Sequence, residues 1–149
     1  MAKSDEATLL QLDEQQVRDA CMRYWAGFDR RDAEIYLAAF TDDATLSLFD
    51  GQLVLNVAEF VADGGLQKAG FEHTSHTPAS QVVRVDGDTA TADTLVTAVL
   101  VPADGPVMVR GIRYQDDLVR TDRGWRIKHR LHSALWQYNT ERVDTRTTF

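Results

Sequence analysis

Residues 89–101, TATADTLVTAVLV, repeat with the period of two that is typical of a β-strand. The same period recurs in three neighbouring segments, and we expect further strands over 75–85, 107–120 and 125–135. Short turns rich in Asp, Gly and Pro separate these segments. Short turns join antiparallel neighbours, so the second half of the chain should be an antiparallel meander.

The first half of the chain has the period of a helix instead. Apolar side chains spaced by three and four residues predict a first helix over 12–28, after a loose leader over 1–10. Asp13 is the expected N-cap of this helix. The buried stripe should contain Val17, Ala20, Cys21, Tyr24 and Phe28.

Two shorter helices and a hairpin should follow. The pattern predicts helices over 33–40 and 57–62, the second ended by Gly64-Gly65. The helix over 33–40 should end at the segment Thr41-Asp42-Asp43-Ala44. Between the two helices, strands over 45–49 and 52–55 flank an Asp50-Gly51 turn. The expected caps are Asp32 and Asn56.

Helices followed by an antiparallel meander indicate the α+β class. We expect a cone-shaped roll, in which a strongly curved sheet and about three N-terminal helices enclose a pocket. A single domain should span 1–149, with its core at about 12–136 and a loose polar tail over 137–149. Phe149 could cover the pocket or contact a partner.

The composition excludes several classes of partner. The 149 residues carry a formal net charge of −7 and contain no basic run, which disfavours a nucleic-acid or anionic-membrane surface. No apolar segment is typical of a signal peptide or a membrane span, so we expect a cytoplasmic protein. Cys21 is the only cysteine, which excludes an internal disulfide.

A candidate acid–base group lies at the end of the first helix. Asp29 falls where the helix dipole disfavours a carboxylate, so a partner elsewhere is expected, and His76 is the candidate. Tyr24 lies on the buried stripe little more than one turn before Asp29. Because Asp29→Asn removes a charge that the helix dipole disfavours, we expect this substitution to leave the fold intact or slightly more stable.

Several short motifs follow one another in a fixed order along the chain. They are Tyr24, Asp29, Asp32, Phe40-Thr41-Asp42-Asp43-Ala44, His76, Asp86-Gly87-Asp88-Thr89-Ala90, Arg113-Tyr114-Gln115-Asp116 and Gly124-Trp125-Arg126-Ile127. Their order and spacing resemble the SnoaL-like branch of the nuclear transport factor 2-like superfamily, over about residues 12–136. In pattern the chain is most similar to hexachlorocyclohexane dehydrochlorinase, scytalone dehydratase and bile-acid dehydratase.

The resemblance implies catalytic residues at four positions: His76, Asp29, Tyr24 and Arg130. Strict alternation from Trp125 and Ile127 conflicts with the last of these, because it points Arg130 out of the cone. Only a β-bulge between Ile127 and Arg130 would turn Arg130 inward. The expected pocket residues are Trp25, Phe28, Leu46, Leu48, Phe60, His129, Leu131 and Ser133.

This set of residues suits proton abstraction from carbon. Neutral His76 would be the base, Asp29 would fix its tautomer, and Tyr24 would donate a proton or polarise a carbonyl. A lyase of the dehydratase or dehydrohalogenase type, or an isomerase, would act on a hydrophobic cyclic molecule without a cofactor. We expect no metal site, because His73 and His76, like His129 and His132, should point to opposite faces of their strands.

Each candidate also has a structural interpretation. Asp29 would end its helix and pair with Arg30, Arg31 or Lys128, while Tyr24 and His76 would be hydrogen-bonded core residues. The alternative function is a non-catalytic ligand-binding module, or a scaffold subunit such as the small subunit of a ring-hydroxylating dioxygenase. In a scaffold, side chains would fill the cavity.

Two further expectations concern assembly and access. An apolar outer sheet face, with Val99, Val101 and Ile112, predicts a homodimer or homotrimer. The glycine-rich segment 64–72 should form a mobile lip of the pocket.

Overall fold

The predicted long strands all form in the computed structural model, which describes residues 2–143, and each is longer than expected. They are β3 (Phe71–Asp86), β4 (Thr89–Pro102), β5 (Val107–Thr121) and β6 (Gly124–Thr140). Consecutive members pair antiparallel, as the short turns predict. Inward side chains of β4 at alternate positions, including Ala92, Val96 and Ala98, are buried.

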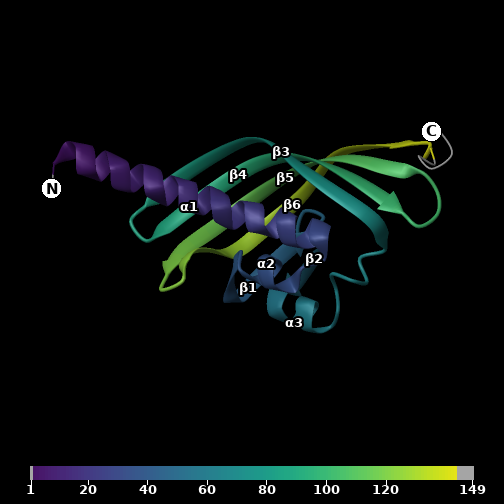
Figure 1. Cartoon of the computed structure of the whole chain (residues 1–149), viewed down its shortest axis with the longest axis horizontal. Coiled ribbons are helices and arrows are strands. Elements are labelled where there is room, and N and C mark those ends of the chain that lie inside the picture. Colours follow the sequence, from purple (N-terminus) through teal and green to yellow (C-terminus); the bar gives the residue numbers. More distant parts are fainter. Residues whose placement is uncertain (1, 144–149) are drawn as a thin grey trace.

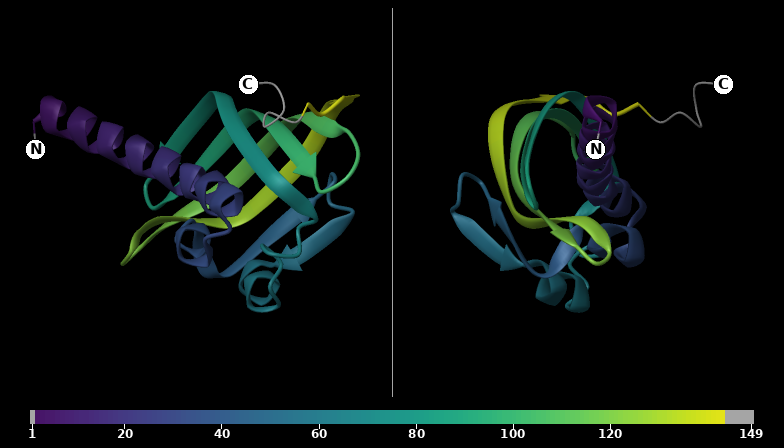
Figure 2. Two further views of the ribbon diagram at one scale, coloured as in Figure 1. Left: turned by 45° about the vertical axis from the view of Figure 1, so that its right-hand side comes forward. Right: turned by 90° about the vertical axis from the view of Figure 1, so that its left-hand side faces the viewer.

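Two shorter strands complete one six-stranded sheet. β1 (Phe40–Leu48) and β2 (Leu53–Asn56) form the predicted hairpin, and the strand order is β2-β1-β6-β5-β4-β3. β1 runs parallel to β6, whereas every other pair is antiparallel. The sheet curls strongly around its inner face (Figure 2). The α+β class and the curved-sheet architecture are therefore confirmed.

The longest helix, α1 (Lys3–Arg30), lies across the open side of the curled sheet (Figures 1 and 2). Its apolar stripe is buried as predicted at Val17, Ala20, Cys21 and Tyr24. The prediction of a loose leader over residues 1–10 is wrong, because the helix begins at Lys3 and its first turns project beyond the sheet (Figure 1).

Asp13 is consequently not an N-cap. It lies in the middle of α1, where its carboxylate accepts hydrogen bonds from Arg120 at 2.7 and 2.8 Å and from Trp125 Nε1 at 3.0 Å. These contacts attach α1 to the turn between β5 and β6.

The second helix, α2 (Ala33–Leu37), is shorter than predicted. Asp32 caps it as expected, accepting a 3.0 Å hydrogen bond from the Ile35 amide. The chain is already extended at Phe40, and the segment 41–44, predicted as a helix stop, belongs to β1. A Cβ added to Gly27 would lie 2.4 Å from the Tyr36 nitrogen, so α1 and α2 approach closely because residue 27 is glycine.

The third helix, α3 (Val57–Ala62), has the predicted bounds. The Asn56 side chain accepts a 3.0 Å hydrogen bond from the Glu59 amide, which confirms the cap. Gly64, with φ of +76°, follows the helix end. Both short helices lie below β3–β6 in this view, beside β1 and β2 (Figure 1).

The end of β6 differs from the expected loose tail. Residues 137–140 continue the strand and pair with β5, down to Val107 opposite Thr140. Trp136 and Tyr138 stack with parallel rings and are about half exposed, as is Leu95 on β4. Ile112, expected on the outer face, is buried and lines the inner cavity instead. The homodimer or homotrimer stays a prediction. Phe149 lies outside the described residues.

No helix within residues 2–143 has both the length and the hydropathy needed to cross a membrane.

Candidate active site

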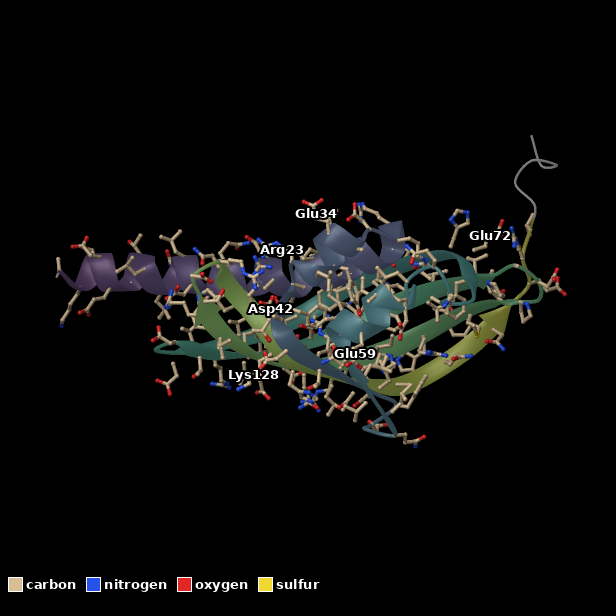
Figure 3. All side chains as sticks on the ribbon, turned by 90° about the horizontal axis from the view of Figure 1, so that it is seen from below. Arg23, Glu34, Asp42, Glu59, Glu72 and Lys128 are labelled. Carbon is tan, nitrogen blue, oxygen red and sulfur yellow. The ribbon has the colours of Figure 1, made fainter. Side chains whose placement is uncertain are left out.

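A β-bulge in β6 determines which side chains enter the cone. Asp117 pairs with His129 but Leu118 pairs with Ile127, so Lys128 is an extra residue between two regular stretches of the β5–β6 ladder. Lys128 is exposed at the edge of the molecule (Figure 3). The bulge resets the alternation, so that both Ile127 and Arg130 are buried.

Three predicted pocket residues on β6 are therefore misplaced. Strict alternation put His129, Leu131 and Ser133 inside, but the bulge turns them to the outer face of the sheet. His129 hydrogen bonds there to Thr45 Oγ1 at 2.7 Å, and Leu131 lines a shallow outer depression. Ser133 pairs with Arg113, whose side chain is exposed. None of the three lines the inner cavity.

Arg130 is fully buried in a cluster that we call the Arg130 cluster. Its guanidinium binds both carboxylate oxygens of Asp116, at 2.6 and 2.7 Å. Burial alone would lower the pKa of Arg130, but the Asp116 carboxylate outweighs it and raises the pKa. The guanidinium carbon lies 4.3–4.7 Å from the ring centroids of Tyr24, Trp25 and Tyr114. The Arg130 cluster contains Arg130, Asp116, Tyr24, Trp25, Tyr114 and Cys21.

The cluster lies behind the cavity wall. Tyr24 and Tyr114 line the cavity, whereas Arg130 and Trp25 do not. Cys21 is buried as expected, its thiol donating to Asp116 Oδ2 at 3.4 Å, and burial raises the pKa of this thiol. The bulge thus brings the predicted Arg130 to the inner face, where its guanidinium packs against the Tyr24 ring and does not line the cavity. The catalytic role of Arg130 stays a prediction.

The structure brings Asp29 and His76 together, and we call this pair the dyad. Asp29 Oδ1 lies 2.6 Å from His76 Nδ1, and Asp29 Oδ2 accepts a 2.9 Å hydrogen bond from the His76 amide. Thr74 Oγ1 donates to Asp29 Oδ1 at 2.8 Å. A carboxylate only accepts, so Nδ1 carries the ring proton and Nε2 of His76 is left as the basic nitrogen.

Neighbouring residues hold the dyad in place. Arg31 has left-handed backbone at the end of α1, with φ of 55°, and donates to Thr74 Oγ1 at 3.1 Å. The Phe28 ring contacts the His76 ring edge-on, with centroids 5.6 Å apart. The His76 side chain is only 6% exposed, so the imidazole is fixed from several sides.

The hydrogen bonds to Asp29 change what its substitution should do. Burial would raise the pKa of Asp29, but the hydrogen bonds from His76 and Thr74 hold it below 3.8. Because the pKa of Asp29 is lower in the folded chain than in the unfolded chain, the ionised carboxylate stabilises the fold at any pH above its unfolded pKa. This stabilisation is lost as the pH falls through the folded pKa. The helix-dipole argument for a neutral or stabilising Asp29→Asn is therefore superseded.

We expect Asp29→Asn to lower the thermal midpoint at pH 7, with a gap to wild type that narrows as the pH falls below 3.8. Circular dichroism melts of both proteins across this pH range measure the gap. A midpoint for the variant equal to or above that of wild type at pH 7 would restore the dipole argument.

The dyad opens onto a cavity of about 340 Å³ inside the cone. Tyr24 and His76 line it, together with four of the eight predicted pocket residues: Phe28, Leu46, Leu48 and Phe60. Gly65, Lys68, Ala69 and Phe71 also line it, so the segment predicted as a lip does border the cavity. Its mobility stays a prediction.

Sequence reasoning missed several residues of the wall. His132 and Arg110 enter from β6 and β5, and the phenols of Tyr36 and Tyr114 lie beside Tyr24, with ring centroids at 5.2 and 5.6 Å. The Tyr36 hydroxyl is buried without a hydrogen-bond partner among the described residues. A bulge has no distinct signal in this sequence, so only the resemblance-based position of Arg130 could have revealed it.

Within residues 2–143, no cluster of three or more His, Cys, Asp or Glu could hold a metal ion. His129 and His132 lie on opposite faces of β6, and His73 is exposed while His76 points inward.

Solved structures share this architecture at low sequence identity. A proposed scytalone dehydratase from Novosphingobium aromaticivorans is 17% identical, with a TM-score of 0.76 and coverage of 93% of both chains. An NTF2-like protein with a cystatin-like fold from the same species is 23% identical, with a TM-score of 0.72 and coverage of 90% of both. Hexachlorocyclohexane dehydrochlorinase LinA-type3 from Novosphingobium barchaimii is 14% identical, with a TM-score of 0.77, over 94% of this chain and 99% of that chain.

These similarities establish the fold. A search of curated proteins finds no match. The family model of the SnoaL-like domain matches residues 11–131, most of the chain. The chain therefore belongs to the SnoaL-like domain family.

Proposed function

We propose that this protein is a small-molecule enzyme in which His76 removes a proton from carbon. The observation that carries the proposal is the 2.6 Å contact between Asp29 and His76 beside a largely apolar cavity. The reaction is an elimination, of the dehydratase or dehydrohalogenase type, or an isomerisation. The substrate is a hydrophobic cyclic molecule.

The dyad supplies the base. His76 Nε2 has no hydrogen-bond partner among the described residues, so it is free to take a proton from a carbon next to a carbonyl. Asp29 accepts from Nδ1 and stabilises the imidazolium as it forms. The electron pair of the C–H bond then forms a C=C bond, either expelling a leaving group or giving an enolate that is reprotonated elsewhere.

The phenols supply the hydrogen-bond donors. Burial raises the pKa of Tyr24, so its hydroxyl stays protonated and can donate to a carbonyl oxygen or to a departing hydroxyl, which leaves as water. Tyr36, whose hydroxyl has no hydrogen-bond partner within residues 2–143, is a second candidate donor at the same wall. Both groups stabilise negative charge that develops in the transition state.

Proton abstraction can be tested before the natural substrate is known. We expect wild-type protein to accelerate exchange of the acidic protons of bicyclic ketones such as β-tetralone in D₂O, measured by loss of their proton NMR signals. His76→Ala is the comparison protein, because it keeps the cavity but lacks the base. Exchange no faster with wild type than with His76→Ala would contradict the proposal.

The alternative is a non-catalytic ligand-binding module. It would bind the same ketones saturably in titration calorimetry while leaving their exchange rates unchanged. A hollow cavity gives less support to a scaffold subunit, whose interior side chains would fill it.

A further inference from the structure

The β6 bulge brings a second imidazole, that of His132, into the cavity. The residue is 6% exposed, and its ring contacts Tyr114 and Phe49 edge-on, with centroids at 5.4 and 5.7 Å. Nδ1 is buried and has no hydrogen-bond partner among the described residues. Buried polar groups are normally hydrogen-bonded, so an unpaired imidazole in a cavity wall indicates a missing partner.

Burial keeps the His132 ring neutral. Burial first, and then the positive charge of Arg110, together lower the pKa of His132 to about 4, against the opposing effect of Asp50. Asp50 also donates its backbone amide to the His132 carbonyl at 3.2 Å. At neutral pH the ring therefore has one N–H donor and carries no charge.

Arg110 provides a cation in the same cavity wall, close enough for its charge to lower the pKa of His132. It lies on the inner face of β5, lines the cavity, and is only partly exposed. Its Nε donates to Gln137 Oε1 at 2.9 Å, and no carboxylate among the described residues forms a salt bridge with it. An arginine in a cavity wall without an acidic partner can bind an anion.

The cavity wall as a whole has the opposite charge to the protein. The chain carries a net charge of −7, yet no Asp or Glu within residues 2–143 lines the cavity, whereas Arg110 and Lys68 do. Lys68 lies at the exposed rim, with Nζ donating to the Asp63 carbonyl at 2.7 Å. The Asp29 carboxylate is already bonded to Thr74 and His76.

We infer that Arg110 and His132 bind a carboxylate of the substrate, so that the substrate is a hydrophobic ring compound bearing a carboxylate. This inference rests on the proposed function for the reacting end. Arg110 is aligned with Ala98 and His76 across the sheet, two strands from the dyad. Strand spacing places their backbones about 10 Å apart, which a fused-ring acid can span.

The inference is tested with β-naphthoate and its neutral analogue β-naphthamide, titrated into the protein by calorimetry. We expect wild type to bind the naphthoate about tenfold to a hundredfold more tightly than the amide. Arg110→Gln should abolish this preference while leaving the affinity for the amide within about threefold. In NMR titrations, bound naphthoate but not the amide should raise the pKa of His132 above about 4.

Arg113→Gln is the matched control. It makes the same change in the same strand, but on the outer face, where Arg113 contacts Asp93 at 2.9 Å. The control should keep the preference for the acid. Equal affinities in wild type, no saturable naphthoate binding, or an equal loss in Arg113→Gln would each overturn the inference.

The experiment separates this inference from the proposed function. His76→Ala should keep the preference for naphthoate, because the anion site does not include the dyad. If the protein prefers naphthoate but does not accelerate ketone exchange, the carboxylate site is supported and the proposed enzyme is rejected. If it accelerates ketone exchange but shows no preference for naphthoate, the enzyme is supported and the carboxylate site is rejected.

Discussion

His76→Ala and Asp29→Ala are each expected to lower the rate of proton abstraction by about 10²–10⁴-fold. The reason is that Asp29 acts only through His76: the carboxylate fixes the tautomer and stabilises the imidazolium through the 2.6 Å contact. The double variant should therefore be little slower than the slower single variant, since groups that act as a unit are not additive. Ketone exchange in D₂O measures all three rates.

The control for these variants is His73→Ala. His73 lies on β3 three residues before His76, and its side chain is exposed. Its removal should leave exchange unchanged. Multiplicative losses in the double variant would mean that Asp29 and His76 act independently, which would contradict the dyad.

Much of the architecture could be predicted because its signals are local. The bounds of α3 follow from a capping asparagine, an apolar turn and a glycine, all within nine residues of sequence. The β1–β2 hairpin follows from Asp50-Gly51, both with positive φ. The dyad could be predicted because a carboxylate at a helix end requires a partner, and the resemblance indicated His76.

The ends of α1 and β6 were less predictable because tertiary context determines them. The first turns of α1 have exposed leucines at Leu9 and Leu10, and no buried stripe marks them as helical. The end of β6 is polar but continues because β5 offers a partner strand as far as Val107. Pairing over this distance is not visible in a local pattern.

The largest error in the site had a single cause. One extra residue, Lys128, reverses the facing of the side chains from His129 to Ala134, as expected for a period of two, and a second register shift follows at Leu135. The extra residue turned His129, Leu131 and Ser133 outward and brought in Arg130 and His132. Strict alternation predicted that Arg130 points out of the cone, whereas the resemblance predicted a catalytic residue inside it. This conflict was the only sign of the bulge in the sequence.

The second large effect should come from Arg130. We expect Arg130→Met to lower the free energy of unfolding by about 3–5 kcal/mol, because it leaves the Asp116 carboxylate buried without its cation. Packing of Tyr24, Trp25 and Tyr114 around the guanidinium would be lost as well. Urea denaturation followed by tryptophan fluorescence measures the change.

Arg113→Met makes the same side-chain change at an exposed salt bridge, with Asp93, and should cost less than about 1 kcal/mol. The double variant Arg130→Met/Asp116→Leu removes both buried charges and should recover much of the loss, because the isolated carboxylate is what destabilises the single variant. If Arg130→Met costs no more than Arg113→Met, then the Arg130 cluster does not stabilise the fold as described. In that case Arg130 would be available for the catalytic role that the resemblance implies.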